Sequence, residues 1–89
     1  MSKKPWKEIR KKLHEKPDIR IGKAGISEGV IQETKRLLKA KGIIKIKFLK
    51  NIAETKEDVK RLIEGLAEKT NAEIGKIIGR TAILYKKEN

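Results

Sequence analysis

Several residue types are scarce in this 89-residue sequence, and each scarcity narrows its possible functions. Cysteine is absent, which excludes disulfides and thiolate metal sites and fits a reducing compartment, so we expect a cytoplasmic protein. Aromatic residues are limited to one Trp, one Phe and one Tyr, too few for an RNA-binding platform that stacks several bases. The apolar runs are short and interrupted by lysine, so we expect neither a membrane span nor a secretory signal.

Acidic residues are also scarce relative to basic ones, and this imbalance is the strongest functional signal in the composition. Lys and Arg number 24 against 12 Asp and Glu, a formal net charge of +12. On so small a protein, this excess creates a positive field that favours polyanions such as nucleic acids. General solubility or an origin in a hot environment explains many charges, but not a two-to-one excess of one sign.

The length allows one domain, residues 1–89, in which we expect residues 1–4 to form a flexible basic tip. Hydrophobic periodicity and the capping residues Ser27, Gly42 and Thr55 predict the order helix, strand, helix, strand, helix, strand, strand. The predicted helices cover residues 5–16, 27–41 and 55–70, and the predicted strands cover residues 19–21, 43–49, 74–78 and 81–85. Gly65, inside the third helix, is expected to mark a place where another element packs closely.

This order predicts a small layered α/β domain with a four-stranded mixed sheet. Strand–helix–strand units are expected to give parallel neighbours with right-handed crossovers, and the closing hairpin adds an antiparallel strand. The two long helices are expected to cover one face of the sheet. The first helix is expected to cover part of the other face, near Ile83 and Tyr85.

The first helix carries a single apolar stripe, formed by Trp6, Ile9 and Leu13 at helical spacing. We expect Trp6 to lie in the core rather than to stack on a base, and Lys12 to stay in solvent. The basic remainder of this helix fits either a solvated face or a contact with a polyanion.

The closing hairpin is predicted to turn at Gly79-Arg80, with glycine first, as a type II′ turn requires. This register sets Ile74 opposite Tyr85. It also places Gly75 on the face that the two long helices cover.

The carboxyl ends of the first three strands are expected to lie along one edge of the sheet, where ligands of α/β sheets bind. That edge would collect a glycine loop after the first strand, the connection after the second, the hairpin turn and the starts of both long helices. The cations expected there are Lys23, Lys50, Lys56 and Arg80. The opposite edge also carries lysines, namely Lys16, Lys41 and Lys69, but no glycine loop and no helix start.

The glycine loop, Gly22-Lys23-Ala24-Gly25, is a weak motif by itself, because glycines between a strand and a helix often form only a tight turn. It is neither a dinucleotide fingerprint nor a P-loop, whose glycine spacings differ. It resembles the G-x-x-G loop with which KH domains clamp RNA backbone, although that loop joins two helices. The loop alone therefore fits both a turn and a phosphate clamp.

Three segments in register are more specific: residues 19–28 (IRIGKAGISE), 44–47 (IKIK) and 78–85 (IGRTAILY). Together they resemble the CRM domain, also called the YhbY-like family, in its stand-alone prokaryotic form. The resemblance implies a fold similar to the C-terminal domain of translation initiation factor three. It also implies an RNA-binding module that associates with precursors of the large ribosomal subunit, with Gly22, Lys23, Ala24 and Gly25 as the RNA contact.

Geometry, rather than the resemblance, adds Arg20, Lys50 and Arg80 to the expected RNA-binding residues. An alternative is an Alba-like architectural DNA binder, which has a related topology and a similar charge. Catalysis is not expected, because the only histidine is His14 and no nucleophile–base pair or metal-ligand spacing occurs. We therefore expect a monomeric, non-catalytic RNA-binding protein without cofactor or metal.

Overall fold

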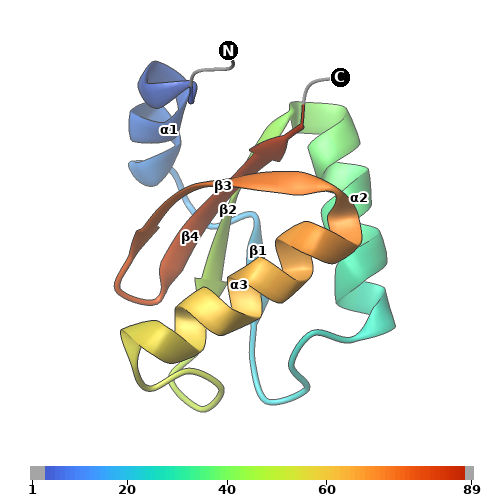
Figure 1. The fold of residues 1–89 in the computed structure, drawn as a ribbon, viewed down its shortest axis with the longest axis vertical. Helices are drawn as coiled ribbons and strands as arrows, with labels where there is room; N and C mark the ends of the chain where they lie inside the picture. Colours follow the sequence, from blue (N-terminus) through green and yellow to red (C-terminus); the bar gives the residue numbers. More distant parts are fainter. Residues whose placement is uncertain (1–3, 88–89) are drawn as a thin grey trace.

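Three helices and four strands follow one another in the predicted order within residues 4–87, the part of the chain that this computed structural model describes (Figure 1). The elements are α1 (Trp6–Leu13), β1 (Ile19–Ile21), α2 (Glu28–Lys41), β2 (Ile43–Phe48), α3 (Lys56–Thr70), β3 (Ala72–Ile78) and β4 (Thr81–Lys86). The small α/β fold with a mixed sheet is thus confirmed. Residues 1–3 of the predicted basic tip lie outside the described residues.

The four strands form one sheet in the order β1-β2-β4-β3. β1 and β2 pair in parallel, and β4 runs antiparallel to both of its neighbours, so β1, β2 and β3 all point the same way. The expectation that each strand–helix–strand unit gives adjacent strands is correct for β1 and β2 and wrong for β2 and β3. β4 takes the central position because Ala82, Ile83 and Leu84 are buried on both of its faces.

α2 and α3 cover one face of the sheet, as predicted, and α1 lies on the other face (Figure 1). The largest fully buried side chains between the sheet and the two long helices are Phe48, Ile21, Ile44, Ile46, Ile63, Leu66 and Leu84. On the α1 side, Ile9 is fully buried beside Ile83. The predicted position of the first helix near Ile83 is therefore confirmed.

The capping residues of α2 and α3 are those that the sequence indicates. The Ser27 hydroxyl accepts a hydrogen bond from the first turn of α2, and Gly42 ends that helix with φ +81°. Thr55 and Asp58 form a complete capping box on α3, and Asn71 ends α3 in the left-handed conformation. These local signals fix where the two long helices start and stop.

The hairpin register differs from the prediction because β3 contains a bulge between Ile74 and Lys76. Ile74 therefore pairs with Leu84 instead of Tyr85. Gly75 lies on the α1 side, where a Cβ atom would come within 2.8 Å of Ile9 Cδ1. The bulge thus lets the backbone of β3 approach α1 closely.

Three further expectations are wrong. Trp6 is not in the core: 47% of it is exposed, and Lys4 Nζ lies 5.5 Å from its ring centroid. Lys12 is not in solvent but is buried. Gly65 marks no close approach, because a Cβ atom there would meet nothing within 4 Å. The eight-residue α1 packs on the sheet mainly through Ile9, which leaves its first turn exposed.

Candidate nucleic-acid interface

The carboxyl ends of β1, β2 and β3 meet at one edge of the sheet, at the lower end of the molecule in Figure 1. We call this edge the rim and define it as the glycine loop (residues 22–25), the β2–α3 connection (residues 49–55) and the hairpin turn (residues 79–80). Both α2 and α3 begin there. The expected gathering of these segments occurs because β3 keeps the direction of β2, although β4 separates them.

The glycine loop is a tight turn whose apex points outward. The Gly25 N–H donates to the Gly22 carbonyl oxygen at 2.8 Å, and Gly25 has φ +71°, which disfavours any other residue. Lys23 and Ala24 at the apex are exposed. Within residues 4–87, the backbone N–H groups of these two residues donate no hydrogen bond, so both are available to a ligand.

The two glycines also let the loop pack against the β2–α3 connection. A Cβ atom at Gly22 would lie 3.1 Å from Leu49 Cδ1, and one at Gly25 would lie 3.2 Å from Ile52 Cδ1. At the same place, the Leu49 N–H donates to the Ile21 carbonyl oxygen at 2.8 Å. The loop and the connection therefore form one surface, in which a larger residue at either glycine would require Leu49 or Ile52 to shift.

Lys50 lies on this connection and is exposed. The connection turns back on itself, because the Ile52 and Ala53 N–H groups both donate to the Leu49 carbonyl oxygen. This turn presents Lys50 and Asn51 at the tip of the connection, next to the glycine loop.

Arg80 is half-buried and ties the hairpin turn to the same connection. Its Nε donates to the Ala53 carbonyl oxygen at 2.8 Å, and its own carbonyl oxygen accepts from the Phe48 N–H at 2.7 Å. A hollow beside it is lined by Glu54, Thr55, Lys56, Gly79 and Arg80. Arg80 thus holds the rim together, a role that the sequence did not indicate.

The two helix starts contribute less positive potential than the sequence suggests, because the chain caps them itself. Asp58 accepts hydrogen bonds from the backbone N–H groups of Thr55 and Glu54, which hold its pKa below the usual value. Glu28 lies in the first turn of α2. These acids partly offset the positive dipole ends. The attraction of the rim for anions therefore depends mainly on its lysines.

Three lysines on the rim or directly beside it are free to meet a ligand. Lys23, Lys50 and Lys56 are exposed, and none forms a hydrogen bond or ion pair with another residue in the described part of the chain. Arg20, by contrast, is not on the rim. It points from β1 to the sheet face opposite α2 and α3, beside its register partner Lys47.

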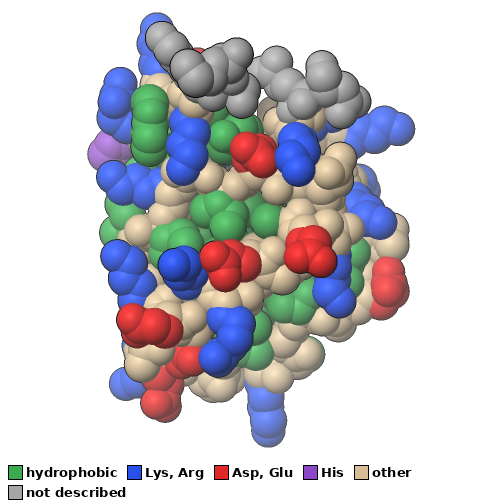
Figure 2. Space-filling view, in the orientation of Figure 1, with side chains coloured by type: hydrophobic (Ala, Val, Ile, Leu, Met, Phe, Trp, Pro, Cys, Tyr) green, Lys and Arg blue, Asp and Glu red, His purple; other side chains and the backbone are tan. Residues whose placement is uncertain are grey.

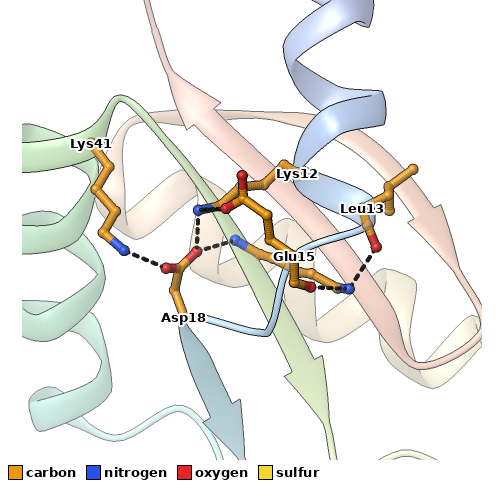
Figure 3. A network of polar contacts seen from close by, with 6 residues as sticks. Lys12, Leu13, Glu15, Asp18 and Lys41 are labelled. Atoms are coloured by element: carbon orange, nitrogen blue, oxygen red, sulfur yellow. Dashed lines mark hydrogen bonds and ion pairs between the residues drawn. The ribbon is translucent and has the colours of Figure 1, made fainter.

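Three lysines near the opposite edge, where β1 and β2 begin, are bound by the protein itself: Lys12, Lys41 and Lys45 (Figure 3). The buried Asp18 carboxylate pairs with Lys41 Nζ at 2.7 Å and with Lys12 Nζ at 3.0 Å, and it accepts from the Lys45 N–H at 2.8 Å. Lys45 Nζ in turn donates to the carbonyl oxygens of Leu13 and Glu15. α1 ends at Leu13, earlier than predicted, where these carbonyl groups meet Lys45.

The protonation equilibria of this network follow from its contacts. Burial alone raises the pKa of Asp18, but hydrogen bonds from Lys41, the Lys45 backbone and Lys12 outweigh it, so the pKa lies below the usual value. Burial likewise lowers the pKa of Lys12, and the contacts with Asp18 and Glu15 raise it above the usual value. Asp18 and Lys12 are therefore both charged at neutral pH.

Within residues 4–87, no helix is long and apolar enough to cross a bilayer. The same residues contain no group of three or more His, Cys, Asp or Glu side chains that could hold a metal ion.

A family model for the CRS1 / YhbY (CRM) domain matches residues 1–86. "Probable RNA-binding protein YqeI" of Bacillus subtilis is 34% identical over 84 residues, which are 91% of this chain and 84% of that protein. "Probable RNA-binding protein MJ0652" of Methanocaldococcus jannaschii is 38% identical over 79 residues, 88% of this chain and 58% of that longer protein.

A solved structure has the same fold. The hypothetical protein SAV1595 from Staphylococcus aureus, described as a candidate RNA-binding protein, superposes with a TM-score of 0.75 at 30% sequence identity. The match covers 93% of this chain and 84% of that one. The likeness to the C-terminal domain of translation initiation factor three stays a prediction.

Proposed function

This chain belongs to the CRS1/YhbY (CRM) domain family, and from that membership and the geometry of the rim we propose that it is a non-catalytic RNA-binding protein. The observation that carries the proposal is the outward apex of the glycine loop, where Lys23 is exposed and two backbone N–H groups have no partner among residues 4–87. Relatives named for RNA binding support RNA as the polyanion.

In this proposal the glycine loop binds phosphate groups of the RNA. The N–H groups of Lys23 and Ala24 donate to phosphate oxygens, and the ammonium groups of Lys23 and Lys50 neutralise them. Arg80 keeps the β2–α3 connection in place and offers its remaining guanidinium N–H groups. Such contacts recognise the backbone of the RNA, so its shape rather than its base sequence selects the target.

Charge reversal at the loop apex tests this proposal. Lys23→Glu should weaken binding to a structured RNA about tenfold, because a charge-assisted phosphate contact is lost and a repulsive one is gained. Lys69→Glu is the matched control, since Lys69 is exposed near the end of α3, away from the rim. Equal affinities of the two variants in a filter-binding titration would refute the loop as the RNA contact.

The salt dependence tests whether phosphates are involved at all. Wild-type affinity should fall steeply as salt rises, because bound phosphates release counterions. A flat dependence would indicate a protein partner instead. Duplex DNA measured at the same salt separates this proposal from an Alba-like DNA binder, which would prefer the DNA.

We further propose that the target lies in ribosomal RNA of the large subunit and that the protein binds it as a monomer during subunit assembly. The family resemblance and the small, strongly basic domain support this target. Crosslinking in cells followed by sequencing of the attached RNA tests it. Reads without enrichment of large-subunit RNA would contradict the target while leaving RNA binding itself intact.

A further inference from the structure

The sheet face opposite α2 and α3 is only partly covered, and its uncovered part borders the rim. α1 covers the middle of this face, where Ile9 lies against Gly75 and Ile83 is fully buried. Two residues closer to the rim, one row of side chains crosses all four strands. This row, which we call the sheet row, consists of the successive register partners Arg20, Lys47, Thr81 and Ile78.

The sheet row is open to solvent and carries only positive charge. Arg20 and Lys47 are exposed, and 49% of Ile78 is exposed. Neither cation has a hydrogen bond or ion pair within residues 4–87, and the row contains no acid. The face over α3 differs, because acidic and basic side chains are interspersed on it (Figure 2).

The pairing of Arg20 with Lys47 has an energetic cost. Like charges on register partners of neighbouring strands repel each other and destabilise the sheet. Asp18, two residues before Arg20, does not compensate this pair, because its carboxylate is already bound by Lys12 and Lys41. An anion bound between the two side chains would remove the repulsion, so this pair is suited to a phosphate group.

The sheet row begins beside the glycine loop. Arg20 is separated from Gly22 by one residue, and the row extends from there across three strand spacings, about 14 Å. Along this path the chemistry changes from two cations to the hydroxyl of Thr81 and then to the aliphatic side chain of Ile78. A lone exposed aliphatic residue is ordinary. Here it ends a continuous row that starts at the proposed phosphate clamp.

This sequence of groups matches a nucleotide chain whose bases are unpaired. Cations suit its phosphates, a hydroxyl group suits the ribose 2′-OH, and an aliphatic side chain suits the face of a base. A duplex keeps the faces of its bases stacked inside, so it would leave Ile78 without a contact. The flat row is therefore better suited to a single strand than to a helix.

We propose that the sheet row binds unpaired nucleotides that adjoin the RNA segment held at the glycine loop. The ligand is then an RNA with a junction between a structured part and a single strand. This inference rests on the proposed function and adds the class of RNA that the site prefers.

The experiment compares a blunt hairpin with the same hairpin carrying a short uridine tail, which is placed at the 5′ end in one version and at the 3′ end in another. The tail should strengthen wild-type binding about fivefold, because it adds phosphate contacts on the sheet row. Lys47→Glu should lose most of this increment. Lys60→Glu should keep it, because Lys60 is an exposed residue of α3 on the other side of the sheet.

The outcomes separate this inference from the proposed function. A tail without effect on the wild type, or Lys47→Glu weakening both probes equally, would overturn the role of the sheet row. Lys23→Glu should weaken both probes; if it weakens neither while Lys47→Glu still removes the increment, the loop proposal fails and the sheet row stands. Thermal melts check that Lys47→Glu folds. The milder Lys47→Gln variant should lose part of the increment.

Discussion

Lysines occur at both edges of the sheet, but the two groups of lysines differ in whether the chain itself binds their ammonium groups. At the opposite edge, Lys12 and Lys41 pair with Asp18, and Lys45 Nζ is bound by two carbonyl groups of the chain. At the rim, Lys23 and Lys50 have no partner within residues 4–87. Three lysines near the opposite edge are thus engaged by the chain itself, whereas Lys23 and Lys50 leave their charge available to a ligand.

The helix ends reinforce this difference. α2 and α3 begin at the rim and end at the opposite edge. A hollow at the helix ends is lined by Lys35, Lys39, Lys86 and Lys87 together with Thr70 and Asn71. Lysines beside the carbonyl end of a helix stabilise its dipole, which by itself repels anions. The hollow is therefore basic but less suited to phosphate than the rim.

The largest effect is expected from breaking the network at the opposite edge. Asp18→Asn should lower the free energy of unfolding by about 2–4 kcal/mol, because it removes the buried carboxylate shared by Lys12 and Lys41 and leaves the buried Lys12 with only the exposed Glu15. Urea denaturation measures this loss. Glu33→Gln is the matched control, since it removes an ion pair with Arg36 that is exposed on α2 and should cost under about 0.5 kcal/mol. The RNA affinity of the folded Asp18→Asn protein should not change.

The pH dependence identifies the carboxylate as the cause. Because the pKa of Asp18 is lowered on folding, its stabilisation is complete above its unfolded value of 3.8 and is lost as the pH falls through the folded value. Wild-type stability should therefore fall more steeply below about pH 4 than that of Asp18→Asn. Parallel acid unfolding curves would contradict this role of Asp18.

Glycine substitutions at the two edges form the next test. Gly25 at the rim and Gly42 at the opposite edge have φ values of +71° and +81°, so alanine at either position should cost about 1 kcal/mol of stability. Only Gly25→Ala also presses on Ile52, and it should weaken RNA binding about threefold by shifting the loop apex. Equal RNA affinities of Gly25→Ala and Gly42→Ala would show that the loop conformation does not matter for binding.

Local signals in the sequence predicted the elements and much of the rim. Ser27, Gly42 and Thr55 act within one turn of their own helix, so their positions mark the helix bounds without knowledge of the fold. The alternation in β1 also indicated that the Arg20 side chain points to the face of the sheet opposite Ile19 and Ile21. This signal would have placed Arg20 on that face rather than on the rim.

Contacts between distant segments could not be predicted in the same way. The burial of Lys12 depends on Asp18, which a turn of the chain brings beside α1. The need for glycine at position 75 comes from the close approach of Ile9, which belongs to a helix more than sixty residues earlier in the chain. Neither partner is visible in the local pattern, because each pairing exists only once the sheet has formed.

The smallest effect is expected from reversing charges in the hollow at the opposite edge. Lys39→Glu combined with Lys86→Glu changes the formal net charge by two for each position, from +12 to +8, while Lys23→Glu changes it only to +10. If the overall field controlled binding, the double variant would be the weaker RNA binder. Because both lysines lie beside helix ends and far from the glycine loop, we expect its affinity to fall less than about twofold at moderate salt, where charges beyond a Debye length are screened. A larger loss than that of Lys23→Glu in the same titration would mean that RNA binds a diffuse basic surface, and the contrast between the two edges would not hold.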